Sequence, residues 1–224
     1  MSEGNALDRM KRLGTGISFI VFPLMLLAGF SLHPNLLSLD RVTDAAQLAE
    51  EFRGSFWFHF GHLLVLFAVP LIIVAGVRCM QLATGRGEWL GFVGGVIGIF
   101  GAFVLAVDKG ALTLVLTAFD TLPPSEFELI YPALQTLLDR AGWLWLVWLL
   151  PLLPFGYALL AVALARAGVI GNTQTVLIVT GLLLLINPDI EVISTVGAVL
   201  MCAGYIPLGI RELQGKLVIG AIRE

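Results

Sequence analysis

Charged residues are scarce in this chain of 224 residues. Asp, Glu, Lys and Arg make up 13% of the sequence and hydrophobic residues 58%, whereas a typical soluble domain has about 25% charged residues. The chain therefore has too few polar side chains to cover a surface in water, and its mean hydropathy of +0.94 indicates an integral membrane protein. We expect the lipid bilayer to be its main partner. A formal net charge of -3, without a basic tract, argues against nucleic acid binding.

Cysteines and catalytic motifs are also rare. The two cysteines, Cys79 and Cys202, lie in different apolar segments, which argues against a disulfide framework and against a cysteine-based metal motif. The chain has no G-x-S-x-G, H-E-x-x-H, phosphate-binding-loop or C-x-x-C sequence. The sequence thus favours a protein that is not an enzyme, and we assign no catalytic residue.

Long apolar runs are abundant. A membrane-spanning helix needs about 20 mostly apolar residues, and six segments qualify: 14–32, 55–77, 90–110, 142–165, 168–187 and 190–210. They predict one domain over residues 1–224, an all-α polytopic membrane helix bundle with six transmembrane helices. The fifth segment begins with the polar residues 172–175, and the last two segments could instead form a hairpin that turns at Asn187 and Pro188.

The distribution of charge predicts the orientation of the bundle. With six spans, nine of the thirteen Lys and Arg residues fall on the side of both termini: Arg9, Lys11, Arg12, Arg78, Arg86, Arg166, Arg211, Lys216 and Arg223. Eleven of the sixteen acidic residues fall on the other side, between Asp40 and Glu191. Because cytoplasmic loops are enriched in Lys and Arg, we expect a cytoplasmic (inner) membrane protein with both termini in the cytoplasm.

The two longer loops, on the predicted outer side, carry amphipathic patterns. In residues 33–54, a short polar helix is expected with Leu48 and Phe52 on one face. After residue 124, apolar residues recur at intervals of three and four: Phe127, Ile130, Leu134, Leu137, Leu138 and Ala141. This spacing predicts a helix that lies on the outer membrane surface or roofs the bundle; the alternative is a helix that binds a partner.

All three histidines belong to the predicted outer half of the membrane. His59 and His62 lie within the second segment and His33 ends the first. Ionisable groups at membrane depth are candidates for function, and imidazole is a common ligand of transition metals and haem. At the same level lie the candidate residues for a proton, ion or ligand site: Asp108, Lys109, Asp189 and Glu191. The alternative is that all of these groups are ordinary interfacial or structural residues.

Small residues line one face of the third segment. Five glycines form a nearly continuous seam: Gly91, Gly94, Gly95, Gly98 and Gly101. Glycine lets a second helix approach closely in the membrane. The seam predicts tight helix packing, either within the chain, which we favour, or between protomers of a homo-oligomer.

The layout resembles bacterial six-helix integral membrane proteins of uncharacterised function. The resemblance is carried by His62, Leu63 and Leu64, by the glycine-rich segment that ends at Asp108, and by the sequence ARAGVI at 165–170. It covers the chain in outline and implies no reaction and no functional residue.

Three functions follow as alternatives. The favoured one is a non-enzymatic accessory or structural subunit that packs against other membrane protein subunits, because the chain is small, its polar groups are sparse and it has the glycine seam. The second is a redox protein in which the histidines bind haem, a transition metal or quinol. The third is a small proton-coupled transporter with Asp108, Lys109 and Glu191 along its path.

Overall fold

The computed structural model describes residues 3–140, 142–187 and 190–217, and in these ranges the chain is helical, with no strand. The prediction of an all-α protein is confirmed. The elements are α1 (Glu3–Ser31), α2 (Ala45–Phe52), α3 (Phe56–Leu82), η1 (Gly85–Gly87), α4 (Glu88–Asp120), α5 (Pro124–Phe127), η2 (Glu128–Ile130), α6 (Tyr131–Leu138), η3 (Gly142–Leu149), α7 (Leu152–Arg166), α8 (Asn172–Leu184) and α9 (Glu191–Leu213).

Six of these helices form a closed ring. Around the ring α1 packs against α3, α3 against α4, α4 against α7, α7 against α8, α8 against α9, and α9 again against α1. Except for α9 and α1, helices adjacent in the ring follow one another in the chain, apart from the short helices between them, as expected for antiparallel neighbours joined by short connections. The side chains that point into this ring therefore determine the size and the polarity of any cavity inside the bundle.

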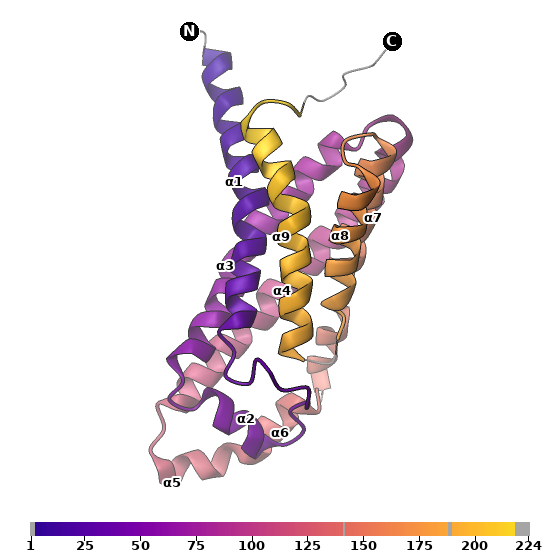
Figure 1. Cartoon of the computed structure of the whole chain (residues 1–224). Coiled ribbons are helices and arrows are strands. Elements are labelled where there is room, and N and C mark those ends of the chain that lie inside the picture. The colour runs from indigo at the N-terminus through magenta and orange to yellow at the C-terminus, as the bar shows by residue number, and fades with distance from the viewer. Residues whose placement is uncertain (1–2, 141, 188–189, 218–224) are drawn as a thin grey trace.

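The two ends of the bundle differ (Figure 1). The start of α1 and the end of α9 lie at one end, here called the terminal end, and α2, α5 and α6 lie at the other, here called the cap end. The chain thus begins and ends at the same end of the bundle. That this end faces the cytoplasm stays a prediction from the distribution of Lys and Arg.

Among the described residues, five helical segments are long and apolar enough to cross a membrane: Ala6–Ser31, Phe56–Leu82, Gly85–Asp120, Gly142–Arg166 and Glu191–Leu213. They correspond to five of the six predicted spans and make this a multi-pass helical bundle suited to lipid. The segment predicted at 168–187 contains α8, which has 13 residues and is about 20 Å long, short of the roughly 30 Å hydrocarbon core. A sixth span therefore stays a prediction.

Two predicted spans have different boundaries from those expected. The helix expected at 90–110 is α4, which has 33 residues and continues to Asp120. Its length of about 50 Å carries it to the cap end, level with the start of α3, where Asp120 Oδ2 lies 3.3 Å from His59 Nε2. The segment expected at 142–165 is not one regular helix: η3 runs to Leu149, and α7 begins after Pro151. Pro151 and Pro154 lack the N–H groups that would continue a helix across this point.

The glycine seam packs within the chain. A Cβ atom on Gly101 would lie 2.1 Å from the backbone nitrogen of Leu153 in α7, and a Cβ on Gly156 of α7 would lie 2.2 Å from the backbone nitrogen of Gly98. On the other side of the seam, a Cβ on Gly95 would lie 2.2 Å from Met80 of α3. The glycines thus let α4 fit between α3 and α7, and all five are buried. Packing within the chain, the alternative that we favoured, accounts for the seam.

The amphipathic helices of the two longer loops form a layer across the cap end. The first is α2; the second is divided into α5, η2 and α6. Phe52, Phe127 and Leu134 have no exposed surface and share one apolar cluster with Phe58 of α3 and Leu116 of α4. The predicted apolar stripe therefore faces the bundle, and these helices roof it.

Candidate functional site

A cavity of about 360 Å³ lies inside the ring, in the half near the cap end. Its wall is formed by α1, α3, α4, α7 and α9, the segment before α7 and the turn before α9. The lining residues are Leu26, Phe30, Arg41, Val65, Leu105, Lys109, Arg140, Val147, Trp148, Leu150, Pro151, Leu153, Pro154, Leu185, Ile186, Asn187, Glu191 and Ser194. A volume of this size lies at the small end of the range for small-molecule sites.

The polar groups of the cavity gather at its cap end. Lys109 lies one turn closer to the cap end of α4 than Leu105, and Glu191 is the first residue of α9. Arg41 and Arg140 come from the connections on either side of the cap layer. The cavity is thus charged toward the cap end and apolar toward the middle of the bundle.

One amide side chain links the end of α8 to the start of α9. Asn187 Nδ2 donates to Leu184 O and to Ser194 Oγ, both at 2.8 Å, and its Oδ1 accepts from Ile190 N at 2.6 Å. Asn187 and Ser194 both line the cavity. These bonds hold that wall in a defined shape.

A layer of side chains forms the floor of the cavity, where the packed core of the terminal half begins. Five residues, one on each of five helices, lie about one helical turn (5.4 Å) from the cavity lining toward the terminal end: Phe22, Val69, Ala102, Tyr157 and Ala198. All five are buried and belong to one core cluster. No lining residue lies on the terminal side of this layer, which we call the closing layer.

Aromatic rings reinforce the closing layer. The Tyr157 hydroxyl donates to Ile72 O, which ties α7 to α3 across the ring. Tyr205 of α9 lies edge-on to Phe22 at 4.9 Å and stacks on Phe19 at 6.3 Å between ring centroids. These contacts fill the middle of the bundle with rigid groups.

His33, just after α1, lies between two carboxylates from different helices. Its Nε2 is 3.8 Å from Glu51 Oε2 of α2 and 3.8 Å from Glu191 Oε1 of α9. Glu51 is buried, and its other oxygen accepts from Asn35 Nδ2 at 2.7 Å. His33 thus joins the cap layer to a wall of the cavity.

Burial sets the protonation of this pair. Burial, together with the smaller effect of the positive charge of Lys109, lowers the pKa of His33 to about 4. Burial raises the pKa of Glu51, against the opposing effect of the Asn35 hydrogen bond. Both shifts favour the neutral forms, as expected for groups withdrawn from water.

The histidines of α3 diverge. His62 Nδ1 is 2.9 Å from Phe58 O, and its ring lies 6.1 Å from that of His33. His59 instead faces the end of α4, where its Nε2 is 3.3 Å from Asp120 Oδ2 without hydrogen-bond geometry. In the described ranges, no group of three or more His, Cys, Asp or Glu is arranged to hold a metal ion. The predicted metal or haem site therefore finds no support there.

The acidic and basic candidates come together only in part. Lys109 Nζ is 3.3 Å from Asp108 Oδ2, and both Lys109 and Glu191 line the cavity. Asp189 lies outside the described residues. Lys109, Glu191 and His33 are thus the sequence-predicted residues that the fold brings to the cavity or next to it.

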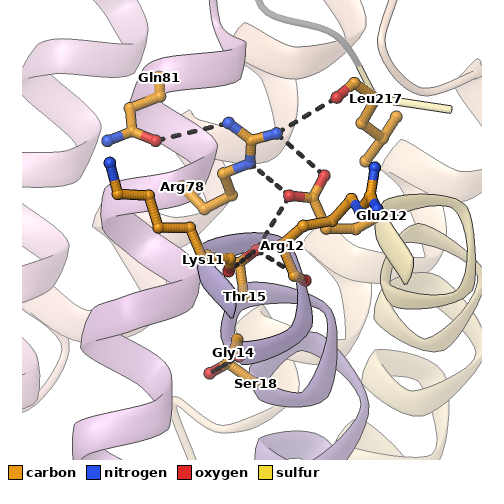
Figure 2. A network of polar contacts seen from close by, with 9 residues as sticks. All are labelled: Lys11, Arg12, Gly14, Thr15, Ser18, Arg78, Gln81, Glu212 and Leu217. Atoms are coloured by element: carbon orange, nitrogen blue, oxygen red, sulfur yellow. Dashed lines mark hydrogen bonds and ion pairs between the residues drawn. The ribbon is translucent and has the colours of Figure 1, made fainter. Parts of the chain in front are cut away.

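A second polar group lies at the terminal end (Figure 2). Arg78 of α3 binds Glu212 of α9 with two bonds, Nε to Oε1 at 2.8 Å and Nη2 to Oε2 at 3.0 Å. Thr15 of α1 donates to the same Oε1 at 2.9 Å, and Arg78 Nη2 also donates to Leu217 O at 3.2 Å. We call Thr15, Arg78 and Glu212 the terminal clamp. It joins three neighbouring helices of the ring below the closing layer.

The terminal clamp was missed in the sequence, where Arg78 was read only as one of the positive charges near the termini. One signal was present: Arg78 and Glu212 each lie near the terminal end of an otherwise apolar helix. Opposite charges at one membrane level tend to pair.

Comparison with known proteins gives no match to a family model, to a curated protein or to a solved structure.

Proposed function

We propose that the protein is a small proton-coupled carrier that binds a small molecule in the cavity and moves it across the membrane. The observation that carries this proposal is the cavity itself, charged at the cap end and separated from the terminal end by packed core residues, of which the closing layer is the first. Carriers hold their substrate between helices near the middle of the membrane and open to one side at a time. We take a bundle with a cavity in its cap half and a packed terminal half as one of the two states that such a cycle needs.

The terminal clamp supports the same proposal. Thr15, Arg78 and Glu212 hold α1, α3 and α9 together where a path to the terminal end would open. An ion pair removed from water is stable only while both partners stay together. Separation of α3 from α9 therefore has a defined energetic barrier, which suits a gate.

His33 supports proton coupling. Its ring is faced by Glu51 from α2, by Glu191 from α9 and by the His62 ring from α3, while Lys109 of α4 acts on it through its charge. A negative group bound beside Lys109 would weaken the repulsion of a proton on His33. By linkage, the bound proton would strengthen binding of the negative group equally.

The other two functions have less support. The accessory-subunit prediction depended in part on the glycine seam, which is used between α3, α4 and α7. It stays a prediction, as does a homo-oligomer. The redox prediction has no metal-binding cluster in ranges 3–140, 142–187 and 190–217 to support it. We further propose the cytoplasmic membrane as the location, with the terminal end in the cytoplasm, in accordance with the distribution of Lys and Arg.

Side-specific thiol labelling tests the carrier proposal. Cys79 is buried between the closing layer and the terminal end and serves as a native reporter in a Cys202→Ser background. Ser194→Cys, with Cys79→Ala and Cys202→Ser, reports on the cavity. A membrane-impermeant methanethiosulfonate is added to right-side-out and to inside-out vesicles, with exposed Gln214→Cys in the same background as the positive control for terminal access.

A carrier exposes its two sides in turn, so we expect Ser194→Cys to react from the cap side and Cys79 to react from the terminal side. The reaction of Cys79 should be slower than that of Gln214→Cys, because it requires the terminal clamp to open. If Cys79 reacted only after denaturation, the bundle would be static and the carrier proposal would be wrong.

A further inference from the structure

The two shortest helices of the ring are neighbours. Helices α7 and α8 have 15 and 13 residues, whereas the other four ring helices have between 23 and 33. The two lie side by side on one flank of the bundle (Figure 1). At 1.5 Å per residue, regular α-helix covers only about 20 Å of this flank. Toward the cap end, the wall is therefore formed by η3 and by the residues that follow α8.

The cavity lies against this part of the wall. On this flank its lining includes residues from the range 147–151, before α7, and the three residues 185–187, after α8. Pro151 lacks the N–H group that would continue α7 toward the cap end. The flank of the cavity is thus built from short segments where the opposite flank has the long helices α3 and α4.

Two residues of these segments face both the cavity and the outside of the bundle. Trp148 is 65% exposed and Ile186 is 37% exposed, and both line the cavity. Three other lining residues, on α1, α3 and α4, are buried: Leu26, Val65 and Leu105. Lining the cavity therefore does not by itself make a residue exposed. At Trp148 and Ile186 a single side chain separates the cavity from the surroundings of the bundle.

The surface around these two residues is apolar. Side chains three positions apart in a 3-10 helix share one face, and Trp145, three positions before Trp148, is exposed as well. Leu183, one turn before Ile186, is also exposed. Because Trp is enriched where lipid headgroups meet hydrocarbon, we expect this part of the wall to face the cap-side leaflet just below its headgroups.

We infer that the ligand enters the cavity sideways from the cap-side leaflet, between Trp148 and Ile186, and is a small amphipathic molecule that dissolves in the membrane. Its apolar body would lie against Leu26, Val65 and Leu105, and its polar end toward the cap end. A volume of about 360 Å³ suits a small molecule rather than a phospholipid with two long chains. The inference rests on the proposed function only in taking the cavity as the transport site.

Two thiol reagents with the same reactive group test the route. Val65→Cys, on the Cys79→Ala and Cys202→Ser background, reports on the apolar wall of the cavity and is reconstituted in proteoliposomes. N-octylmaleimide dissolves in the bilayer, whereas a maleimide with a sulfonate group stays in water. Each labelling rate is divided by the rate of the same reagent with the unfolded protein, which removes the difference in intrinsic reactivity.

We expect N-octylmaleimide to label Val65→Cys at least about tenfold faster than the sulfonated reagent. Ile186→Trp narrows the entrance and should slow labelling by N-octylmaleimide by about tenfold, whereas Trp148→Ala widens it and should speed labelling. Leu183→Trp and Trp143→Ala are the matched controls, because they change exposed residues that do not line the cavity. Each control should change the rate by less than about twofold.

Faster labelling by the sulfonated reagent would overturn the inference. So would a rate with N-octylmaleimide that neither Ile186→Trp nor Trp148→Ala changes beyond its control. If Cys79 still reacted from the terminal side in either case, the carrier proposal would stand, with a substrate that enters from water. The expected rates together with an unreactive Cys79 would instead support the lateral entrance and contradict transport.

Discussion

Arg78 and Glu212, 134 positions apart in the chain, form a two-pronged ion pair at the terminal end, with Nε–Oε1 and Nη2–Oε2 distances of 2.8 and 3.0 Å. Glu212 is only 1% exposed. The carboxylate thus depends on Arg78 and Thr15 for its stabilisation. The carrier proposal places a gate at this ion pair. The strength of the pair should therefore affect both the stability of the bundle and the opening of the gate.

Replacing one partner of the ion pair should destabilise the protein more than replacing both partners. Arg78→Met leaves Glu212 buried without its cation, and we expect a loss of about 3 to 5 kcal/mol in the free energy of unfolding. Arg78→Met with Glu212→Met removes both charges and should restore much of this loss. Unfolding in mixed micelles measures the difference, with exposed Arg86→Met as the control. A double variant no more stable than Arg78→Met would contradict this view of the clamp.

Helix α4 should tolerate a methyl group on Gly110, outside the glycine seam, and not on Gly101, within it. A Cβ on Gly101 would lie 2.1 Å from the backbone of Leu153, whereas on Gly110 it would meet only Leu66, at 3.9 Å. We expect Gly101→Ala to cost about 1 to 3 kcal/mol through overpacking and Gly110→Ala to stabilise slightly through helix propensity. Thermal unfolding of the two variants checks this. Similar melting temperatures would show that α4 and α7 are not in close contact.

Acid should destabilise the folded protein through His33. Its pKa is about 4 in the folded protein, below the usual value of 6.5, so the unfolded chain binds a proton first as the pH falls. The stability present above pH 6.5 is then lost between about 6.5 and 4, by up to about 3 kcal/mol. Glu51 acts in the opposite direction, because its raised pKa lets the folded state take up a proton before the unfolded one.

Comparing variants isolates the contribution of His33. Unfolding between pH 7 and 4 should show a smaller acid loss in His33→Gln than in the wild type, since Glu51 is retained in both. Lys109→Gln removes one cause of the lowered pKa of His33 and should narrow the pH range over which stability is lost. An unchanged pH profile in His33→Gln would contradict the account of this site.

Opening the closing layer should connect the cavity to the terminal half of the bundle. Tyr157 is 1% exposed and bonds to Ile72 O across the ring. Tyr157→Ala should allow a cap-side thiol reagent to reach Cys79, whereas Tyr157→Phe keeps the ring and should not. The rate of labelling in right-side-out vesicles measures this. If the reagent labelled Cys79 equally slowly in both variants, the barrier to the reagent would lie elsewhere than at Tyr157.

Apolar length and small-residue spacing predicted much of the fold. The five helices long enough to span a membrane correspond to predicted segments, and the seam from Gly91 to Gly101 is buried as expected of a packing face. The boundary errors come from proline and from tertiary support: Pro151 divides one segment, and cap-layer contacts extend α4 to Asp120. Average hydropathy does not give either boundary: the apolar character continues through Pro151, and it continues from residue 110 to Phe119 without marking where the membrane ends.

The site was less accessible to sequence reasoning, because it depends on contacts between distant segments. His59 and His62, three positions apart, point toward different neighbours, one to α4 and one to α1. The fold brings His33 within 3.8 Å of Glu51 and of Glu191, which lie in two different helices. Residue spacing along one helix cannot predict such a contact. Lys109 and Glu191 were predicted at one membrane level and do line one cavity, whereas Arg41 and Arg140 were not singled out as site residues.

The central claim, that the terminal end opens and closes, is tested most directly by a distance between α3 and α9. Spin labels at Thr84→Cys and Gln214→Cys, on the Cys79→Ala and Cys202→Ser background, report this distance in proteoliposomes by electron–electron double resonance. The account predicts two distance populations, with the longer one enriched in Glu212→Gln, because this change weakens the terminal clamp. A single unchanged distance, in Glu212→Gln as well as in the parent, would contradict it.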